Sequence, residues 1–292
     1  MSTLEGAAMG SRALVLGGGG ITGIAWELGM LTGLAELSVD LGQADLVVGT
    51  SAGAVVGAQL LADLDLEQRY AAQLESPGGE ARPRLPHLYL TRLVWATIRA
   101  RDPAEFRVRM GRMALAARTS SEAERRAEIV RWLGGAHTWP ERRLVITSVE
   151  AESGKFVTFD AASGVELVDA VAASVCTPGV RPPATVRGRR HIDGGMRSAA
   201  NVDLAAGHEQ VVVLAPVTRG GGPMPAAEDQ VTALRPNARV VMISPDEDAR
   251  RSMGSSPRDM LDPARRPAVA RAGRAQAAKV AELAADVWRT TG

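Results

Sequence analysis

A serine between two glycines is the part of this sequence whose residue types and spacing best suit chemistry. Ser51 lies in a Gly-Thr-Ser-Ala-Gly stretch that follows the apolar run Leu46–Val48 and precedes a run of small residues. A strand that reverses directly into a helix leaves no room for Cβ atoms, so Gly49 and Gly53 flank the turn and the hydroxyl is exposed at its top. The pattern predicts a nucleophilic Ser51, although it also occurs in ordinary turns.

A second glycine-rich segment can supply hydrogen-bond donors to this serine. Gly18, Gly19 and Gly20 follow the apolar run Ala13–Leu16, which fits a buried strand beside the serine strand. Without side chains, their N–H groups can turn inward as an anion-binding nest. The N–H of Ala52, next after the serine, adds a further donor. Together these groups are the predicted oxyanion hole.

The same segment also matches a dinucleotide-binding fingerprint, Gly18-x-Gly20-x-x-Gly23. That fingerprint expects an acidic residue at the end of the second strand, roughly 20 residues further on. Here the second strand ends at Gly49, and Asp45 precedes it. A non-catalytic, nucleotide-binding α/β module is therefore an alternative that the sequence favours less.

The base that would activate Ser51 stays open between two arrangements. Asp193 closes a predicted strand, and Gly194 and Gly195 keep the following turn open. A carboxylate there can accept the serine proton directly if its surroundings tune its pKa, but Asp-Gly is also an everyday turn signal. The order Ser51, Asp193, His208 also matches the chain order of a serine–histidine–aspartate triad, although such serines follow several strands and this one follows one.

The remaining histidines are weaker candidates. His191 lies on the strand before Asp193, and we expect it to be structural. His87 and His137 fall in an inserted region of different character.

Apolar periodicity places these motifs in an α/β fold. Strand, glycine loop, helix, strand, serine turn and helix open the chain, which is the start of a sheet covered by helices on both faces. Residues 64–140 interrupt it with arginine-rich, tryptophan-bearing helices, broken at Pro77-Gly78-Gly79. These helices form an ordinary solvated face with tryptophans in the core, cover the site as a lid, or meet anionic lipid head groups. Further strands are expected over 143–149, 155–159, 186–192, 211–214 and 240–243, and helices over 165–174 and 264–288.

Composition describes an ordinary globular protein. The chain has 292 residues, a formal net charge of +1 and no linker that divides it, so we expect one domain over residues 1–292. There is no 18-residue apolar run and no signal-peptide pattern. The only cysteine, Cys176, excludes an intrachain disulfide, and we expect a cytoplasmic location. Arginine abundance alone does not indicate a nucleic-acid partner, and we expect none.

In this order, the glycine loop 18–23, the serine turn 49–53 and the turn 193–195 resemble the motifs of the patatin-like phospholipase family, above all its bacterial members. The segment 173–178 with the prolines at 182 and 183 is similar to the family's stretch before the aspartate. The resemblance covers about residues 12–216. It implies a three-layer α/β/α fold with a mostly parallel central sheet. It also implies a Ser-Asp dyad, with Ser51 as nucleophile, Asp193 as base and the glycine loop as oxyanion hole.

The implied reaction is hydrolysis of a lipid acyl ester through an acyl-enzyme, of the phospholipase A or lysophospholipase type, without metal or cofactor. Acyl transfer to an acceptor other than water is an alternative. Thr22 stands where the family usually carries Arg or Lys, and Asn201-Val202 where it often shows Asn-Pro. The expected partner is the lipid substrate, with peripheral membrane contact as a second expectation. The sequence does not indicate an oligomeric state.

Overall fold

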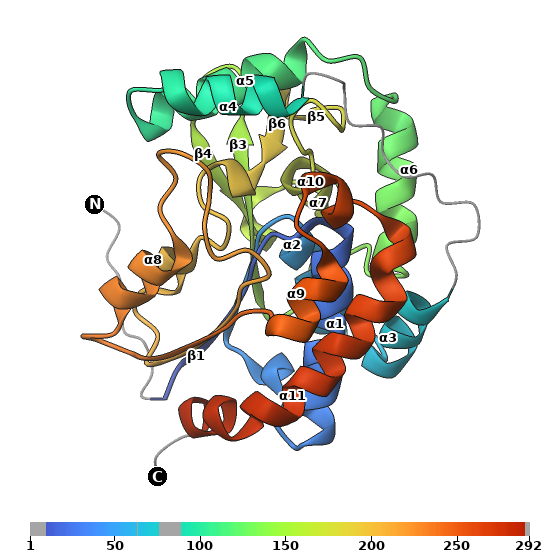
Figure 1. Cartoon of the computed structure of the whole chain (residues 1–292), viewed down its shortest axis with the longest axis vertical. Coiled ribbons are helices and arrows are strands. Elements are labelled where there is room, and N and C mark those ends of the chain that lie inside the picture. The colour runs from blue at the N-terminus through green and yellow to red at the C-terminus, as the bar shows by residue number, and fades with distance from the viewer. Residues whose placement is uncertain (1–9, 63, 76–88, 290–292) are drawn as a thin grey trace.

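The computed structural model describes residues 10–62, 64–75 and 89–289, which form an eight-stranded sheet between helices (Figure 1). Along the sheet the order is β5-β6-β3-β2-β1-β7-β8, and β4 pairs with β3. Five neighbouring strands, from β3 to β8, run parallel, while β4 and β6 are antiparallel to β3 and β5 to β6. The strands are β1 (Arg12–Leu16), β2 (Leu46–Gly49), β3 (Arg143–Glu150), β4 (Phe156–Phe159), β5 (Ala184–Val186), β6 (Arg189–Asp193), β7 (Gln210–Leu214) and β8 (Arg239–Ile243).

The two faces of the sheet are buried under different layers, because strand side chains alternate. Leu14 and Leu16 face the layer of α1, α2, α7 and α11, whereas Ala13 and Val15 face α8 and the segment 198–205. The predicted three-layer fold with a mostly parallel sheet is therefore confirmed. The helices are α1 (Gly20–Glu36), α2 (Ala52–Leu61), α3 (Leu66–Leu74), α4 (Tyr89–Arg99), α5 (Pro103–Leu115), α6 (Glu122–Leu133), α7 (Leu167–Ser174), α8 (Ala227–Leu234), α9 (Glu247–Met253), α10 (Pro257–Met260) and α11 (Arg266–Trp288); short 3-10 turns lie at Leu41–Gln43, Ala161–Ser163, Gly194–Met196, Val202–Ala205 and Pro263–Arg265.

The strand order reverses between β1 and β7. From β1 the chain adds β2 and β3 on one side, and β7 and β8 extend the sheet on the other. Open α/β sheets bind ligands outside the carboxyl ends of their strands at such a point. The glycine loop after β1 lies there, since the Gly17 N–H donates to the Leu214 carbonyl at the end of β7 at 2.9 Å.

The inserted region is helical, as the sequence predicted. It contains α3, α4, α5 and α6, of which α3 contacts α1 and α11. The helices α4 and α5 contact each other and bury Phe106 and Met110 with Val149 and Ile192 of the sheet. The predicted break at Pro77-Gly78-Gly79 lies outside the described residues.

The single strand predicted over 186–192 is wrong, because the chain forms a hairpin there. Val186 pairs with Arg189 in antiparallel β5 and β6. The two residues between them, Arg187 and Gly188, have φ angles of 50° and 74°. Positive φ at both central residues is the type I′ hairpin turn, for which Asn-Gly is the usual sequence signal. Arginine in the first position concealed the turn.

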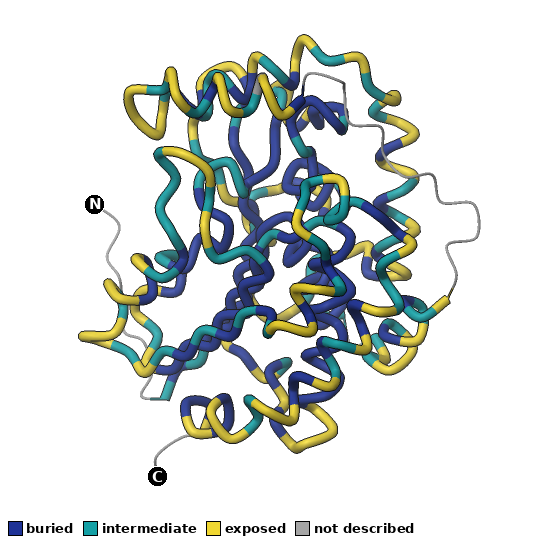
Figure 2. The backbone as a smooth tube through the Cα atoms, in the orientation of Figure 1, coloured by how far each residue is buried: buried dark blue, intermediate teal, exposed yellow. Residues whose placement is uncertain are grey.

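The C-terminal helix α11 was predicted over 264–288 and is observed. It lies along α1, which is buried over nearly its whole length (Figure 2). The contact is close because α1 and α11 meet at glycines: a Cβ on Gly29 would lie 2.2 Å from the Ala270 carbonyl oxygen, and one on Gly273 2.5 Å from that of Trp26. Within the described residues no helix is both long and apolar enough to cross a bilayer.

Candidate active site

Ser51 lies in a strained turn between β2 and α2. Its φ of 52° and ψ of −110° are uncommon for a residue with a side chain. A Cβ on Gly53 would lie 2.1 Å from the Leu16 carbonyl oxygen, and one on Gly49 would lie 2.7 Å from the Ala54 Cα. Both flanking positions therefore require glycine, as the sequence predicted. The turn holds the Ser51 side chain at the carboxyl end of β2.

Asp193 contacts this serine directly. Ser51 Oγ donates a hydrogen bond to Asp193 Oδ2 at 2.8 Å, across 142 positions of sequence. Asp193 ends β6, opposite Ser148 of β3, and its Oδ1 accepts the Gly195 N–H at 2.8 Å. Burial raises the pKa of Asp193 to about 6, and the hydrogen bonds from Gly195 and Ser51 oppose part of that rise. This carboxylate is a stronger base than an ordinary aspartate and is still ionised at neutral pH.

Because Gly194 has no side chain, the turn after Asp193 can lie directly against β3. A Cβ at Gly194 would lie 2.2 Å from Thr147 Oγ1, which is closer than atoms can approach. A Cβ at Gly195 would lie 3.0 Å from Asp193 Oδ1. The two glycines thus let the chain turn sharply enough to present the carboxylate to the serine.

A buried polar network positions the serine turn, and sequence reasoning missed most of it. Asn201, with φ of 53°, donates from Nδ2 to Thr50 Oγ1 at 3.0 Å. Thr147 Oγ1 also donates to Thr50 Oγ1 at 3.0 Å. The Ser51 N–H donates to Ser174 Oγ at 2.9 Å. The available signal was the position of these polar residues at the ends of buried apolar segments. From the sequence, Asn201 was named individually, and Thr50 and Ser174 only as parts of longer motifs.

Three of the four predicted oxyanion donors are available. Among the described residues, the N–H groups of Gly19, Gly20 and Ala52 have no hydrogen-bond partner. Gly20 and Ala52 begin α1 and α2, so both helix dipoles favour negative charge here. The prediction for Gly18 is wrong for this conformation, because its N–H donates to the Ala199 carbonyl oxygen at 2.7 Å.

Thr22 fixes the glycine loop instead of bringing a charge to it. The side chain is fully buried, and its hydroxyl donates to the carbonyl oxygens of Gly19 at 3.3 Å and Met260 at 3.5 Å. The glycine loop itself therefore carries no cation near Ser51. Gly23 packs closely against the serine turn, because a Cβ there would lie 3.1 Å from the Ala52 Cβ.

A cavity of about 520 Å³ opens on Ser51 and Asp193. This volume is within the range of small-molecule sites. Its walls are mainly apolar, with Leu93 and Val94 from α4, and Phe106 and Met110 from α5 among them. Helices α4 and α5 of the inserted region therefore line the site, which is one of the arrangements that the sequence left open. That α4 and α5 move as a lid stays a prediction.

His208 does not take part in this site, so the triad prediction is wrong. It precedes β7, at the end of the sheet opposite the glycine loop, and its Nδ1 lies 3.2 Å from the Ala205 carbonyl oxygen. His191 is structural, as expected: its Nδ1 lies 3.2 Å from Ser148 Oγ and its ring packs against Phe159. Burial lowers the pKa of His191.

Neither of the other two histidines is placed at the site by the described residues. His137 is exposed after α6, and His87 lies outside the described residues.

The geometry also disfavours a dinucleotide site. Asp45 lies before β2, and its Oδ2 accepts the Arg12 N–H at 2.7 Å. It is therefore at the amino end of the strands, whereas the glycine loop is at the carboxyl end. The acidic residue that the fingerprint needs beside a ribose is absent from the end of β2, which closes at Gly49.

The chain is similar to one known protein family and to two solved structures. A family model described as patatin-like phospholipase matches residues 14–206, more than half of the chain. The crystal structure of VipD from Legionella pneumophila is similar at 13% identity and a TM-score of 0.47, over 95% of this chain and 68% of that one. The crystal structure of the type III effector protein ExoU is similar at 18% identity and a TM-score of 0.43. That alignment covers 94% of this chain and 53%, about half, of the ExoU chain. No curated protein matches.

Proposed function

The chain belongs to the patatin-like phospholipase family, and from that premise we propose that it is a lipid acyl hydrolase in which Ser51 and Asp193 form the catalytic dyad. The observation that carries the proposal is the 2.8 Å hydrogen bond from Ser51 Oγ to Asp193 Oδ2. It joins a strained, partly accessible hydroxyl to a buried base, at the mouth of an apolar cavity.

In the first step Ser51 Oγ attacks the ester carbonyl carbon while its proton passes to Asp193 Oδ2. The carbonyl oxygen becomes an oxyanion, which the free N–H groups of Gly19, Gly20 and Ala52 are placed to stabilise. The negative charge moves from the carboxylate to the oxyanion, so the net charge of the site does not change. When the tetrahedral intermediate collapses, the alcohol leaves with the proton from Asp193, and the acyl group stays on Ser51.

In the second step a water molecule attacks the acyl-enzyme. Asp193 accepts the proton of that water, the same donors hold the new oxyanion, and the fatty acid leaves as Ser51 Oγ recovers a proton. Because the 520 Å³ cavity begins at Ser51 and is lined by apolar residues of α4 and α5, it suits the acyl chain. This arrangement favours the phospholipase A or lysophospholipase type of reaction.

Hydrolysis of p-nitrophenyl butyrate tests the dyad without a membrane. We expect Ser51→Ala and Asp193→Asn each to lower kcat/KM by at least about 10³-fold, since residues that act as one unit lose most of the rate singly. Ser153→Ala, at an exposed serine in the turn before β4, should change it less than twofold. Hydrolysis retained in both dyad variants would exclude the mechanism.

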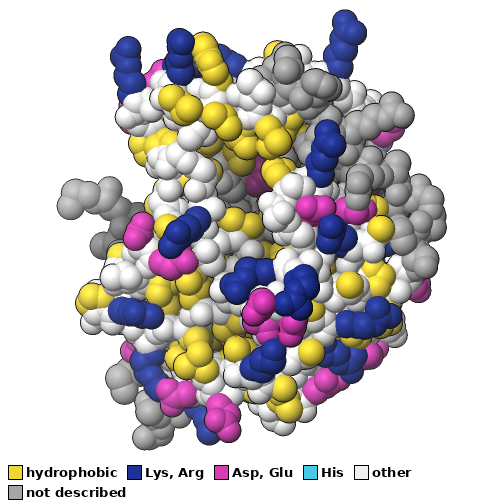
Figure 3. Space-filling view, in the orientation of Figure 1, with side chains coloured by type: hydrophobic (Ala, Val, Ile, Leu, Met, Phe, Trp, Pro, Cys, Tyr) yellow, Lys and Arg dark blue, Asp and Glu magenta, His cyan; other side chains and the backbone are white. Residues whose placement is uncertain are grey.

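The proposal includes peripheral contact with an anionic membrane through α4. Leu90, Val94, Trp95 and Ile98 are all more than half exposed on this helix. Apolar side chains gather at the top of Figure 3, where Figure 1 places α4, above the hollow of the molecule. The Arg99 guanidinium lies 3.7 Å from the centre of the Trp95 ring. No acidic residue lies between 89 and 101, so apolar, aromatic and basic groups share one face, as in helices that lie in a bilayer interface.

A further inference from the structure

A second, smaller cavity meets Ser51. It measures about 20 Å³, room for one water-sized group, so it can hold a single oxygen atom but no acyl chain. Gly20 and Ala52, whose N–H groups have no partner among the described residues, form part of its wall. These residues begin α1 and α2, so the positive ends of two helices meet there. The small cavity is therefore well suited to hold an oxyanion formed at Ser51.

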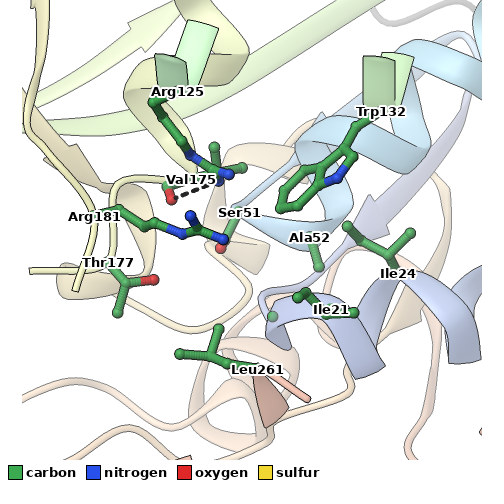
Figure 4. Close-up of a pocket in the computed structure, with 11 residues that line it drawn as sticks. Ile21, Ile24, Ser51, Ala52, Arg125, Trp132, Val175, Thr177, Arg181 and Leu261 are labelled. Atoms are coloured by element: carbon green, nitrogen blue, oxygen red, sulfur yellow. Dashed lines mark hydrogen bonds between the residues drawn. The ribbon is translucent and has the colours of Figure 1, made fainter. Parts of the chain in front are cut away.

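Two arginines also line the small cavity. Arg125 comes from α6 and Arg181 from the segment after α7, and Figure 4 shows both guanidinium groups extending towards Ser51. Of the described residues in the wall, these two alone carry a charge. A negative charge that develops in this cavity therefore meets arginine as well as backbone N–H groups.

Arg125 is fixed by its surroundings. Its side chain is only 4% exposed and lies over the Trp132 ring, with Cζ 4.4 Å from the ring centre. Nη1 lies 2.6 Å from Glu128 Oε2, and Nη2 reaches the Val175 carbonyl oxygen at 3.5 Å. Arg125 therefore adds a fixed positive charge to the wall and helps to hold Glu128.

Arg181 shares that carboxylate but keeps free donors. Its Nη1 and Nη2 donate to the two carboxylate oxygens of Glu128, each at 3.1 Å. These are the hydrogen bonds that join its guanidinium to the described part of the chain, and the side chain is 15% exposed. Because a guanidinium has more N–H groups than one carboxylate uses, Arg181 can bind another anionic oxygen without leaving Glu128.

The charges of these side chains are balanced before the reaction. Glu128 and Asp193 are two carboxylates beside the two guanidinium groups of Arg125 and Arg181. Arg125 lowers the pKa of Asp193, whereas Arg181 is not among the groups that shift it. When Ser51 passes its proton to Asp193, the negative charge reappears on the oxyanion. The balance is kept, and the charge moves from a place that Arg125 alone influences to a cavity that both arginines line.

We propose that Arg181 is a catalytic residue that donates a hydrogen bond to the oxyanion in the small cavity. This inference rests on the proposed hydrolase function and adds a charged donor to its backbone oxyanion hole. In that step the bond between Ser51 Oγ and the carbonyl carbon forms, the carbonyl π pair moves onto its oxygen, and the hydroxyl proton passes to Asp193 Oδ2. The contact with Arg181 exists only once the charge is on that oxygen. Such an interaction stabilises the transition state and not the bound substrate, so it raises kcat.

Hydrolysis of p-nitrophenyl butyrate, which has no charged head group, tests this role. Arg181→Gln leaves Arg125 and Glu128 as a balanced pair, so the variant is expected to fold. It should lower kcat by about 10²-fold, the cost of one oxyanion donor. KM should change by less than about threefold, because the lost contact is absent from the bound substrate.

Two further variants serve as controls. Arg181→Lys keeps a charged donor and should lower kcat by less than about tenfold, since lysine binds as a point charge. Arg126, next to Arg125 on the same helix, pairs with Glu166 and Asp169 at the surface. Arg126→Gln should therefore keep the kcat of the wild type.

Butyl trifluoromethyl ketone measures the oxyanion contact apart from turnover. Ser51 Oγ adds to its carbonyl carbon and Asp193 takes the proton, which leaves a tetrahedral adduct with a negatively charged oxygen. Because such an adduct resembles the transition state, Arg181→Gln should weaken ketone binding by the same factor by which it lowers kcat/KM. A residue that only supports the fold would not produce this proportion.

The pH dependence separates the two arginines. Asp193 is faced by Arg125 of α6, by Tyr89 of α4 and by Cys176 after α7. Burial raises the pKa of Tyr89 and of Cys176 to about 12, so both are neutral at working pH. Arg125→Gln should move the rise of kcat/KM to higher pH, because Arg125 lowers the pKa of Asp193. Arg181→Gln should lower the plateau and leave the position of the rise unchanged.

An Arg181→Gln variant with the kcat of the wild type, or with a loss in KM alone, would overturn the assignment. Ketone binding that stays tight while kcat falls would overturn it too. Should Arg181→Gln not fold, the proportion between kcat/KM and ketone binding is measured in Arg181→Lys, and its absence there has the same meaning. A wild type that neither hydrolyses the ester nor binds the ketone overturns the proposed function itself, whereas a wild type that does both, matched by Arg181→Gln, overturns only the role of Arg181.

Discussion

In the proposed dyad Asp193 contacts Ser51 directly, where a serine–histidine–aspartate triad has a histidine, and this changes the expected pH dependence. The base must be ionised to accept the Ser51 proton, and its pKa is raised to about 6 by burial. We therefore expect kcat/KM for p-nitrophenyl butyrate to rise about tenfold per pH unit below 6 and to level off above it. A pH profile that is flat from 4 to 8 would contradict Asp193 as the base, and Asp193→Asn should show no such step.

The same raised pKa predicts the effect of Asp193 on stability. The unfolded chain releases this proton near pH 3.8, whereas the folded chain holds it to about pH 6. The unfolding free energy due to Asp193 therefore falls as pH rises from about 4 to about 6 and is level above. Two pKa units correspond to about 3 kcal/mol.

Asp193→Asn lacks this ionisation, so it should be more stable than the wild type above pH 6. Urea unfolding of both proteins at pH 4 and pH 8 measures the change in their difference. A difference that does not grow with pH would mean that the carboxyl is not desolvated as described.

At the residue scale, the sequence predicts the groups that lie in local motifs. Ser51, its flanking glycines and Asp193 are found where their turns place them. Arg125 and Arg181, which line a small cavity at Ser51, are not predictable in this way, because α6 and the segment after α7 bring them there only in the folded chain. The order of Ser51, Asp193 and His208 along the chain matched a triad. Chain order, however, does not show at which end of the sheet a residue lies.

At the scale of elements, the serine turn depends on how closely α2 approaches β1. In a solvent-exposed helix, Gly→Ala is stabilising by about 1 kcal/mol. At Gly53 the new Cβ would lie 2.1 Å from the Leu16 carbonyl oxygen, so Gly53→Ala should instead destabilise by at least about 2 kcal/mol. Denaturant unfolding measures this change.

The control is Gly221→Ala, where the nearest atoms to a new Cβ are 4.0 Å away. It should alter stability by less than about 0.5 kcal/mol. A neutral Gly53→Ala would show that the turn is looser than described, and the geometry of Ser51 would lose its support.

Elements with long apolar runs were predicted well, and irregular ones were not. The buried strands β1, β2, β7 and β8 follow from their apolar runs, and helix α11 follows from Val280, Leu283 and Val287 at helical spacing. The β5–β6 hairpin was missed because its turn, Arg187-Gly188, uses positive φ without the usual Asn-Gly signal. That the insertion is helical was predictable. That α4 and α5 line the large cavity at Ser51 while α3 contacts α1 follows only from tertiary packing.

At the scale of the whole molecule, segments from both ends of the chain build the site. The family model ends at residue 206, yet Met260 and Leu261 line the large cavity and Thr22 reaches the Met260 carbonyl. This supports the proposal that the chain works as one domain.

The exposed apolar side chains of α4 predict how the protein binds to a membrane surface. Trp95→Ala with Ile98→Ala should weaken flotation with phosphatidylglycerol-containing vesicles at least about tenfold, because each buried large side chain stabilises by about 1.5–3 kcal/mol. The Ser51→Ala background keeps the lipid intact, so binding is measured apart from catalysis. Vesicles of phosphatidylcholine alone should bind more weakly.

Leu283→Ala is the control, because Leu283 is 55% exposed on α11, away from α4. It should bind vesicles like its parent. Equal binding by the α4 variant, or equal loss in the Leu283 control, would contradict docking through α4.

The most direct test of the account is the site of labelling by a fluorophosphonate, read by peptide mass spectrometry. The reagent captures a serine that is activated as a nucleophile and whose adduct is held by oxyanion donors. We expect one adduct per chain, at Ser51, absent in Ser51→Ala and formed at least about 10²-fold more slowly in Asp193→Asn. Labelling at another serine, or undiminished labelling of Asp193→Asn, would contradict a hydroxyl activated by that carboxylate.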